Sequence, residues 1–237
     1  MAHGIKALVF DVFGTLVDWR GSVAREGQAW GAARGIDIDW FAFADAWRGA
    51  YHPSMDKVRK GERPWTILDV LHRETLDRLL DQFGIADVSE EDKDHWNRVW
   101  HRLTPWPDTV PGMLALKPKF ILATASNGNV ALLLNMAKNA GMPFDTILSA
   151  ELCRHYKPDP EMYQSTYTFL GLQPHEVLMT AAHNSDLVAA SRQGLRTAFF
   201  PRPTEYGPAQ VKDKQADHAF DFVATDLLDL ARQLRAV

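Results

Sequence analysis

The chain has 237 residues, of which 46% are hydrophobic, and its formal net charge is −4. This length and composition suit one large domain or a core with an insertion, and the slightly acidic charge argues against a nucleic-acid partner. The one cysteine, Cys153, has no partner for an internal disulfide, and no apolar run approaches the ~20 residues that span a bilayer. We therefore expect a cytoplasmic protein with no membrane partner.

The first predicted strand covers residues 5–10 and ends at the carboxylate of Asp11. A Gly14-Thr15 turn follows, so this carboxylate is expected at the carboxyl edge of a sheet, where open α/β folds bind their ligands. Phe13 stands two residues after Asp11. One carboxylate beside an aromatic ring favours attack on carbon over the binding of a metal ion.

The middle of the chain, residues 17–106, is predicted to be helical, with no strand between Trp19 and Trp106. Large apolar residues such as Trp40, Phe43 and Trp47 recur there at helical spacing, and all eight tryptophans of the chain lie in this block. The enrichment indicates a small helical core built from large side chains. It also agrees with a lid whose underside forms the apolar wall of a pocket above Asp11.

Short apolar runs and helical patterns alternate after residue 106, which is typical of βαβ units with a parallel sheet. We therefore predict an α/β fold with a Rossmann-like parallel sheet. The expected strands after the first are 120–125, 146–149, 177–181, 197–200 and 222–224, and the expected helices are 130–140, 161–170, 187–193 and 227–234.

Three more groups of polar residues follow the ends of predicted strands. Ser126 and Asn127 come after 120–125, and Lys157 precedes Pro158 in what should be an extended turn. The run His183-Asn184-Ser185-Asp186 comes after 177–181. Each group alone also has a structural interpretation, such as a helix cap or a solvated side chain.

Taken in order, these groups resemble the motifs of the haloacid dehalogenase (HAD) superfamily along the whole chain. Asp11-Val12-Phe13-Gly14-Thr15-Leu16 resembles the first motif, Ser126 the second, Lys157-Pro158 the third and Asp186 the last. The resemblance implies a Rossmann-like core of the HAD type, formed by residues 1–16 and 107–237. A helical cap would be inserted after the first strand, at residues 17–106.

The chain departs from the magnesium-dependent phosphatases of that superfamily at two positions. Their second Asp corresponds to Phe13, and the carboxylate four residues before their final Asp corresponds to Ala182. Because Mg²⁺ needs several oxygen ligands, we expect no metal and no cofactor. Both departures are typical of the 2-haloacid dehalogenase branch (type II, L-2-haloacid dehalogenase-like), which hydrolyses short 2-haloalkanoic acids without metal. Trp47-Arg48 resembles a Trp-Arg pair of this branch, in which the Arg assists departure of the halide.

The resemblance implies a reaction in two steps. Asp11 would displace the halide and form an ester, while Lys157 keeps Asp11 ionised, and water activated by Asp186 would then hydrolyse the ester. His183 replaces the Asn of the branch and is expected to orient this water or to contact the halide. Thr15 and Ser126 would bind the substrate carboxylate or the carbonyl oxygen. The candidates for substrate and halide binding are Val12, Phe13, Arg48, Asn127 and Asn184.

Two other functions stay open in the sequence: a phosphatase on the same fold, and a non-catalytic HAD-like binding protein. The expected partner is a small haloacid, and the sequence allows a homodimer without requiring one. These residues do not rank fluorinated substrates, fluoroacetate included, against chlorinated or brominated ones. They also do not fix which enantiomer of the substrate is preferred.

Overall fold

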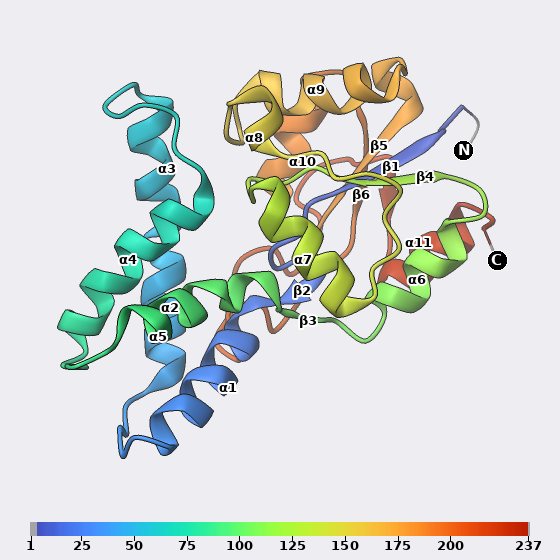
Figure 1. Cartoon of the computed structure of the whole chain (residues 1–237). Helices are drawn as coiled ribbons and strands as arrows, with labels where there is room; N and C mark the ends of the chain where they lie inside the picture. The colour runs from blue at the N-terminus through green and yellow to red at the C-terminus, as the bar shows by residue number, and fades with distance from the viewer. Residues whose placement is uncertain (1–3, 237) are drawn as a thin grey trace.

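A parallel sheet forms the centre of the computed structural model, which describes residues 4–236 (Figure 1). Its strand order is β4-β1-β5-β6-β7. The strands are β1 (Ala7–Phe10), β4 (Ile121–Thr124), β5 (Val177–Ala181), β6 (Arg196–Phe199) and β7 (Phe222–Val223). Numbered along the core alone, the order is 2-1-3-4-5, as in flavodoxin-like folds, and such sheets bind ligands where the order reverses. Here the reversal lies at the end of β1.

Strand β1 is the most enclosed part of the sheet. It pairs in parallel with β4 on one side and with β5 on the other. All four of its residues have no exposed surface. A strand that is covered on both faces has no polar side to show, which explains why its sequence is a continuous apolar run.

Helices connect the strands and cover the sheet. They are α6 (Thr109–Leu116), α7 (Val130–Ala140), α8 (Ala150–Cys153), α9 (Pro160–Leu170), the short η2 (Pro174–Glu176), α10 (Asn184–Ser191) and α11 (Leu227–Gln233). Gly141 and Gly171 end α7 and α9 in the left-handed conformation, with φ of 67° and 65°. Glycine has no Cβ and adopts this conformation without strain, so both helices stop at these residues.

A second group of helices follows the first strand in the sequence and precedes the other strands of the sheet. Figure 1 shows this group at the left of the molecule. Its members are α1 (Trp19–Ala32), α2 (Trp40–Gly49), α3 (Tyr51–Arg59), α4 (Leu68–Gln82), α5 (Glu90–Asn97) and η1 (Arg98–His101). Aromatic rings fill its interior. Trp47 stacks on Trp96 with 6.3 Å between ring centroids and meets Trp100 edge-on. The tryptophan-rich block is therefore a packed helical core, as the sequence predicts.

Two expected elements differ in the structure. Residues 146–149 form no strand, because the side chain of Thr124 takes part of the hydrogen bonding that a strand partner would provide. Its Oγ1 donates to Leu148 O and accepts from Leu148 N, which leaves isolated bridges at Thr146 and Ser149. In addition, β2 (Val17–Asp18) pairs antiparallel with β3 (Thr104–Pro105). The prediction of no strand between Trp19 and Trp106 was wrong for β3, since two residues are too few to show an alternating pattern.

No helix in the described range 4–236 is both long enough and apolar enough to cross a membrane.

Candidate active site

Asp11 begins the loop that leaves β1, at the reversal point of the sheet. Its backbone N–H donates to Thr180 O of β5 at 3.0 Å, which extends the strand pairing by one residue. Thr15 Oγ1 donates to Asp11 Oδ2 at 2.7 Å across the tight turn. The carboxylate is therefore fixed at the carboxyl edge of the sheet, as the sequence predicts.

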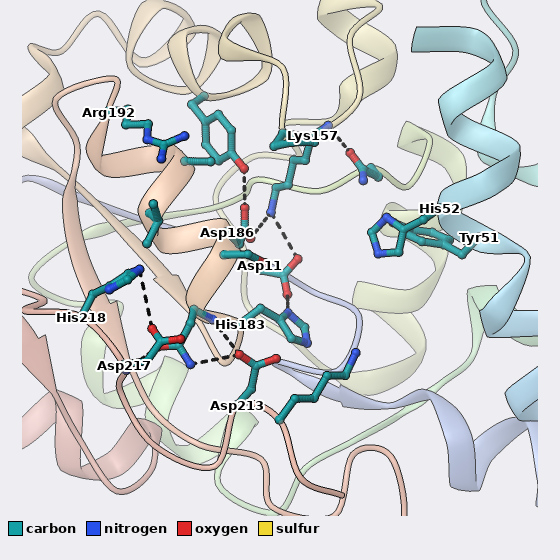
Figure 2. Close-up of a pocket in the computed structure, with 18 of the residues that line it drawn as sticks. Asp11, Tyr51, His52, Lys157, His183, Asp186, Arg192, Asp213, Asp217 and His218 are labelled. Atoms are coloured by element: carbon teal, nitrogen blue, oxygen red, sulfur yellow. Dashed lines mark hydrogen bonds and ion pairs between the residues drawn. The ribbon is translucent and has the colours of Figure 1, made fainter. Parts of the chain in front are cut away.

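Lys157 connects two carboxylates at this edge. Its Nζ lies 3.2 Å from Asp11 Oδ1 and 2.6 Å from Asp186 Oδ2, as Figure 2 shows. The backbone N–H of Lys157 donates to Asn127 Oδ1 at 2.8 Å, and the hydroxyl of Tyr163 donates to Asp186 Oδ1 at 2.6 Å. Residues from three loops and two helices thus form one network around a single ammonium group.

The charges of this network decide which groups are ionised. Burial alone would raise the pKa of Asp11, but the charge of Lys157 and then the hydrogen bond from His183 outweigh it and hold that pKa well below its ordinary value. Burial raises the pKa of Asp186, and the charge of Asp11 adds to this although Lys157 opposes it. Asp11 is therefore the carboxylate that stays ionised most readily.

His183 approaches Asp11 from the side opposite Lys157. Its Nδ1 lies 2.9 Å from Asp11 Oδ2, and its Nε2 lies 2.9 Å from Oε2 of Glu205. The other carboxylate oxygen of Glu205 accepts from Trp19 Nε1 at 3.0 Å. Glu205 was not singled out in the sequence, because a Glu within the polar, proline-containing segment 201–208 looks like an ordinary surface residue.

The room for Glu205 depends on a glycine. Gly14 has φ of +84°, and a Cβ there would lie 2.0 Å from Glu205 Oε1. We expect Gly14→Ala to lower the free energy of unfolding by about 1–3 kcal/mol, through backbone strain and the displaced carboxylate. Gly35→Ala is the matched control, because Gly35 has φ of +67° with nothing within 4 Å of a Cβ.

Urea unfolding of the two glycine variants separates these causes. Gly35→Ala carries the strain of a left-handed residue alone, so the larger loss should fall on Gly14→Ala. Equal losses would show that the Glu205 carboxylate moves aside freely, and would contradict the tight fit.

Arg48 of α2 covers the site from the helical block. Its guanidinium carbon lies 4.1 Å from the ring centroid of Tyr51, and its Nη1 is buried without a hydrogen-bond partner in the protein. A buried donor with no partner carries a free-energy cost unless a ligand satisfies it. Arg48 and Tyr51 line, together with Asp11 and Asn127, a cavity of about 620 Å³.

The remaining predicted site residues differ in whether they line this cavity. Val12, Phe13 and Ser126 are buried and are not among its lining residues, and Ser126 Oγ accepts from Gly128 N at 3.3 Å. Asn184 lines the cavity, but its amide is hydrogen-bonded to Asp213, Gln215 O and Asp217 N. In this arrangement Asn184 anchors the segment 213–217, and Arg48 and Asn127 remain the predicted binding residues that face the cavity.

The donor set does not fit a magnesium ion. The ring of Phe13 is packed edge-on against Tyr51 and Trp100, at the position where a second carboxylate would lie. Asp11 and Asp186 already pair with the ammonium of Lys157, and Ala182 offers no side-chain oxygen, so too few oxygen ligands are left for the ion. Across residues 4–236, no three His, Cys, Asp or Glu side chains are grouped as a metal site requires.

The sequence model described as haloacid dehalogenase-like hydrolase matches residues 5–190 of the chain. The chain belongs to this family. A curated relative, (S)-2-haloacid dehalogenase 4A of Burkholderia cepacia, is 30% identical over 90% of this chain and 91% of its own. Within the HAD family, the chain therefore belongs to the branch of the L-2-haloacid dehalogenases.

Solved structures agree with this assignment. A crystal structure of a defluorinating L-2-haloacid dehalogenase has a TM-score of 0.95 and 48% identity, covering 98% of this chain and 95% of its own. The L-2-haloacid dehalogenase of Xanthobacter autotrophicus, with chloropropionic acid covalently bound, has a TM-score of 0.80 and 26% identity over 98% of both chains.

Proposed function

We infer that the protein hydrolyses short 2-haloalkanoic acids to 2-hydroxy acids through an ester of Asp11, without a metal ion. The observation that carries this is the carboxylate of Asp11, which is held ionised by Lys157 and faces a cavity covered by Arg48. The covalently bound chloropropionic acid in the Xanthobacter relative supports an ester intermediate. The (S)- and L-specific names of the relatives support the same handedness here.

The first step would be displacement of the halide at the carbon next to the substrate carboxylate. An ionised Asp11 has the charge that this attack needs, and its position is fixed by Thr15, Lys157 and His183. Arg48 offers the leaving halide a buried N–H donor that has no other partner. Stabilising the departing anion in this way lowers the barrier, because negative charge already develops on the halogen in the transition state.

The second step would be attack of water on the carboxyl carbon of Asp11. The water oxygen then stays on Asp11, and the product carries the former ester oxygen with inverted configuration. Asp186 is the base expected from the sequence, and the ammonium group of Lys157 lies between it and Asp11. The structure adds His183 as a second candidate, since its Nδ1 contacts the same carboxyl group.

The helical block would act as a cap over this reaction. We propose that residues 17–106 form the cap and that residues 1–16 and 107–237 form the catalytic core. An ion pair supports contact between the two: Arg59 Nη2 of α3 lies 2.7 Å from Asp159, two residues after Lys157. The cysteine content supports the cytoplasm as the site of action.

Halide release in the presence of a chelator tests the proposed function. Chloroacetate, 2-chloropropionate and fluoroacetate are each incubated with the protein and EDTA, and free halide is measured. We expect release from at least one of them, and a single turnover in heavy-oxygen water should label the peptide that contains Asp11. No release from any short 2-haloacid, or hydrolysis of an aryl phosphate only with magnesium, would favour a phosphatase instead.

A further inference from the structure

Glu205 is a buried carboxylate that the two-step scheme leaves without a role. It is 1% exposed, and its two oxygens accept from His183 Nε2 and Trp19 Nε1. Its segment is anchored to the core, because Arg202 donates to Thr15 O and forms a bidentate ion pair with Asp108. Placing a carboxylate at this depth costs free energy, so its contact with His183 is the feature to explain.

The surroundings of His183 favour its protonated form. Burial disfavours its charge, but the charge of Glu205 and then the hydrogen bond to Asp11 outweigh burial and raise the pKa of His183 well above its ordinary value. The other charged or titratable groups that line its cavity are Arg48, Tyr51, His52, Lys157, Tyr163, Asp186, Arg192, Tyr206, Lys212, Asp213, Asp217 and His218. Within the described residues, the ring nitrogens of His183 pair with Asp11 and Glu205 and with none of these groups.

We propose that Glu205 is a positioning residue for the second step, and that the base it orients is His183. The carboxylate holds the proton on Nε2, so the neutral imidazole presents a free Nδ1 to the carboxyl group of Asp11. This Nδ1 accepts the proton of the attacking water. The proposal rests on the proposed function and deepens it, since it assigns proton transfer in ester hydrolysis to a pair from two loops.

The protons balance over one cycle. When Asp11 becomes an ester it loses its negative charge, and His183, which now faces one anion instead of two, releases a proton to solvent. Water adds to the carboxyl carbon and gives its proton to Nδ1. The bond from that carbon to the ester oxygen breaks, and His183 returns the proton to the departing alkoxide. The proton left on the new carboxyl group of Asp11 passes to His183, so the net products are hydroxy acid, halide and one proton.

The geometry favours His183 over Asp186 for this transfer. Both oxygens of Asp186 are engaged, one by Lys157 and one by Tyr163. Lys157 and His183 contact different oxygens of Asp11, at 3.2 Å and 2.9 Å. One oxygen can therefore carry the ester while the other carries the developing negative charge. Asp186 then serves to hold Lys157 in place.

Glu205→Gln tests the proposal, with Glu91→Gln at an exposed position of α5 as the matched control. Trp19 Nε1 fixes the amide oxygen, so the amide N–H₂ faces His183 and moves its proton to Nδ1, the wrong nitrogen. We expect the rate of ester hydrolysis to fall about 10³–10⁴-fold. The first burst of halide should stay within about threefold of the wild type, and mass spectrometry should show the esterified protein accumulating.

The pH dependence of ester hydrolysis in single turnovers gives a readout that a merely structural role would not move. In the wild type the rate should rise with pH as His183 loses its proton, and in Glu205→Gln the midpoint should lie at lower pH because the anion is gone. His183→Ala, which should also accumulate ester, decides the matter if Glu205→Gln does not fold.

Three results would overturn the proposal: hydrolysis by Glu205→Gln at the wild-type rate, a burst that falls as far as turnover does, or no ester in His183→Ala. A wild-type protein that releases no halide would instead refute the proposed function.

Discussion

Replacing Asp11 with Asn should lower halide release from a short 2-haloacid by about 10⁴-fold or more. The amide has nearly the same shape, but it lacks the negative charge needed to displace a halide. It also turns an N–H₂ group toward either Lys157 or His183, which both donate to the native carboxylate. The measurement is the initial rate of halide release, with the halide burst as a check on the first step.

The control for this variant is Asp37→Asn, an Asp to Asn change at an exposed position. The fold of Asp11→Asn should persist, because Lys157 keeps Asp186 and His183 keeps Glu205 as a partner of opposite charge. A circular dichroism spectrum like that of the wild type is therefore expected. Activity above about 1% of the wild type in Asp11→Asn would contradict the role of Asp11 as nucleophile.

Lys157→Met should affect both activity and stability. Without the ammonium, Asp11 and Asp186 lose their shared cation, and the pKa of Asp11 rises because its largest favourable influence is gone. We expect the halide burst to slow about 10³-fold at neutral pH and its acid limb to move to higher pH. The free energy of unfolding should fall by about 3–5 kcal/mol near neutral pH, as for a buried ion pair that loses one partner.

The stability loss of Lys157→Met should depend on pH in a defined direction. The native pKa of Asp11 is depressed, so its ion pair still stabilises the wild type at about pH 4, and this stabilisation is lost only as pH falls further toward the native pKa. In the variant the buried carboxylates lack their cation, which raises their pKa, and they become protonated between pH 7.5 and about pH 4. The stability difference between variant and wild type should therefore shrink over this interval. Urea unfolding at both pH values measures it, with Lys138→Met at an exposed position as control. An equal difference in the free energy of unfolding at both pH values would contradict the charge argument.

The positions of Asp11 and Asp186 could be predicted because each residue comes shortly after the end of a parallel strand, β1 or β5, and such ends meet at one edge of a sheet. Lys157 follows the helix α8 instead, and its place was predicted from the resemblance of Lys157-Pro158 to the third motif. The apolar run before Asp11 and the turn after it were enough to place the carboxylate. The direct contacts of Lys157 with both carboxylates agree with that prediction.

The partners that complete the site could not be predicted in the same way. Glu205 follows no strand end directly, and its burial depends on the space left by Gly14 and on Trp19 from another helix. Likewise, nothing local distinguishes Asn184, which anchors a loop, from an amide that binds a ligand. Contacts of this kind depend on how distant segments pack, and a sequence pattern records only local spacing.

The ribbon of β2 and β3 has a consequence for how such enzymes diversify. Because Val17–Asp18 lies directly beside Thr104–Pro105, the chain leaves the sheet and returns to it at almost the same place. The geometry of the sheet is therefore independent of the length and content of the segment between β2 and β3, as it would be for a short hairpin. Mutation can enlarge, shrink or exchange the covering helices, and so alter which molecules are admitted, while Asp11 and Lys157 keep their alignment.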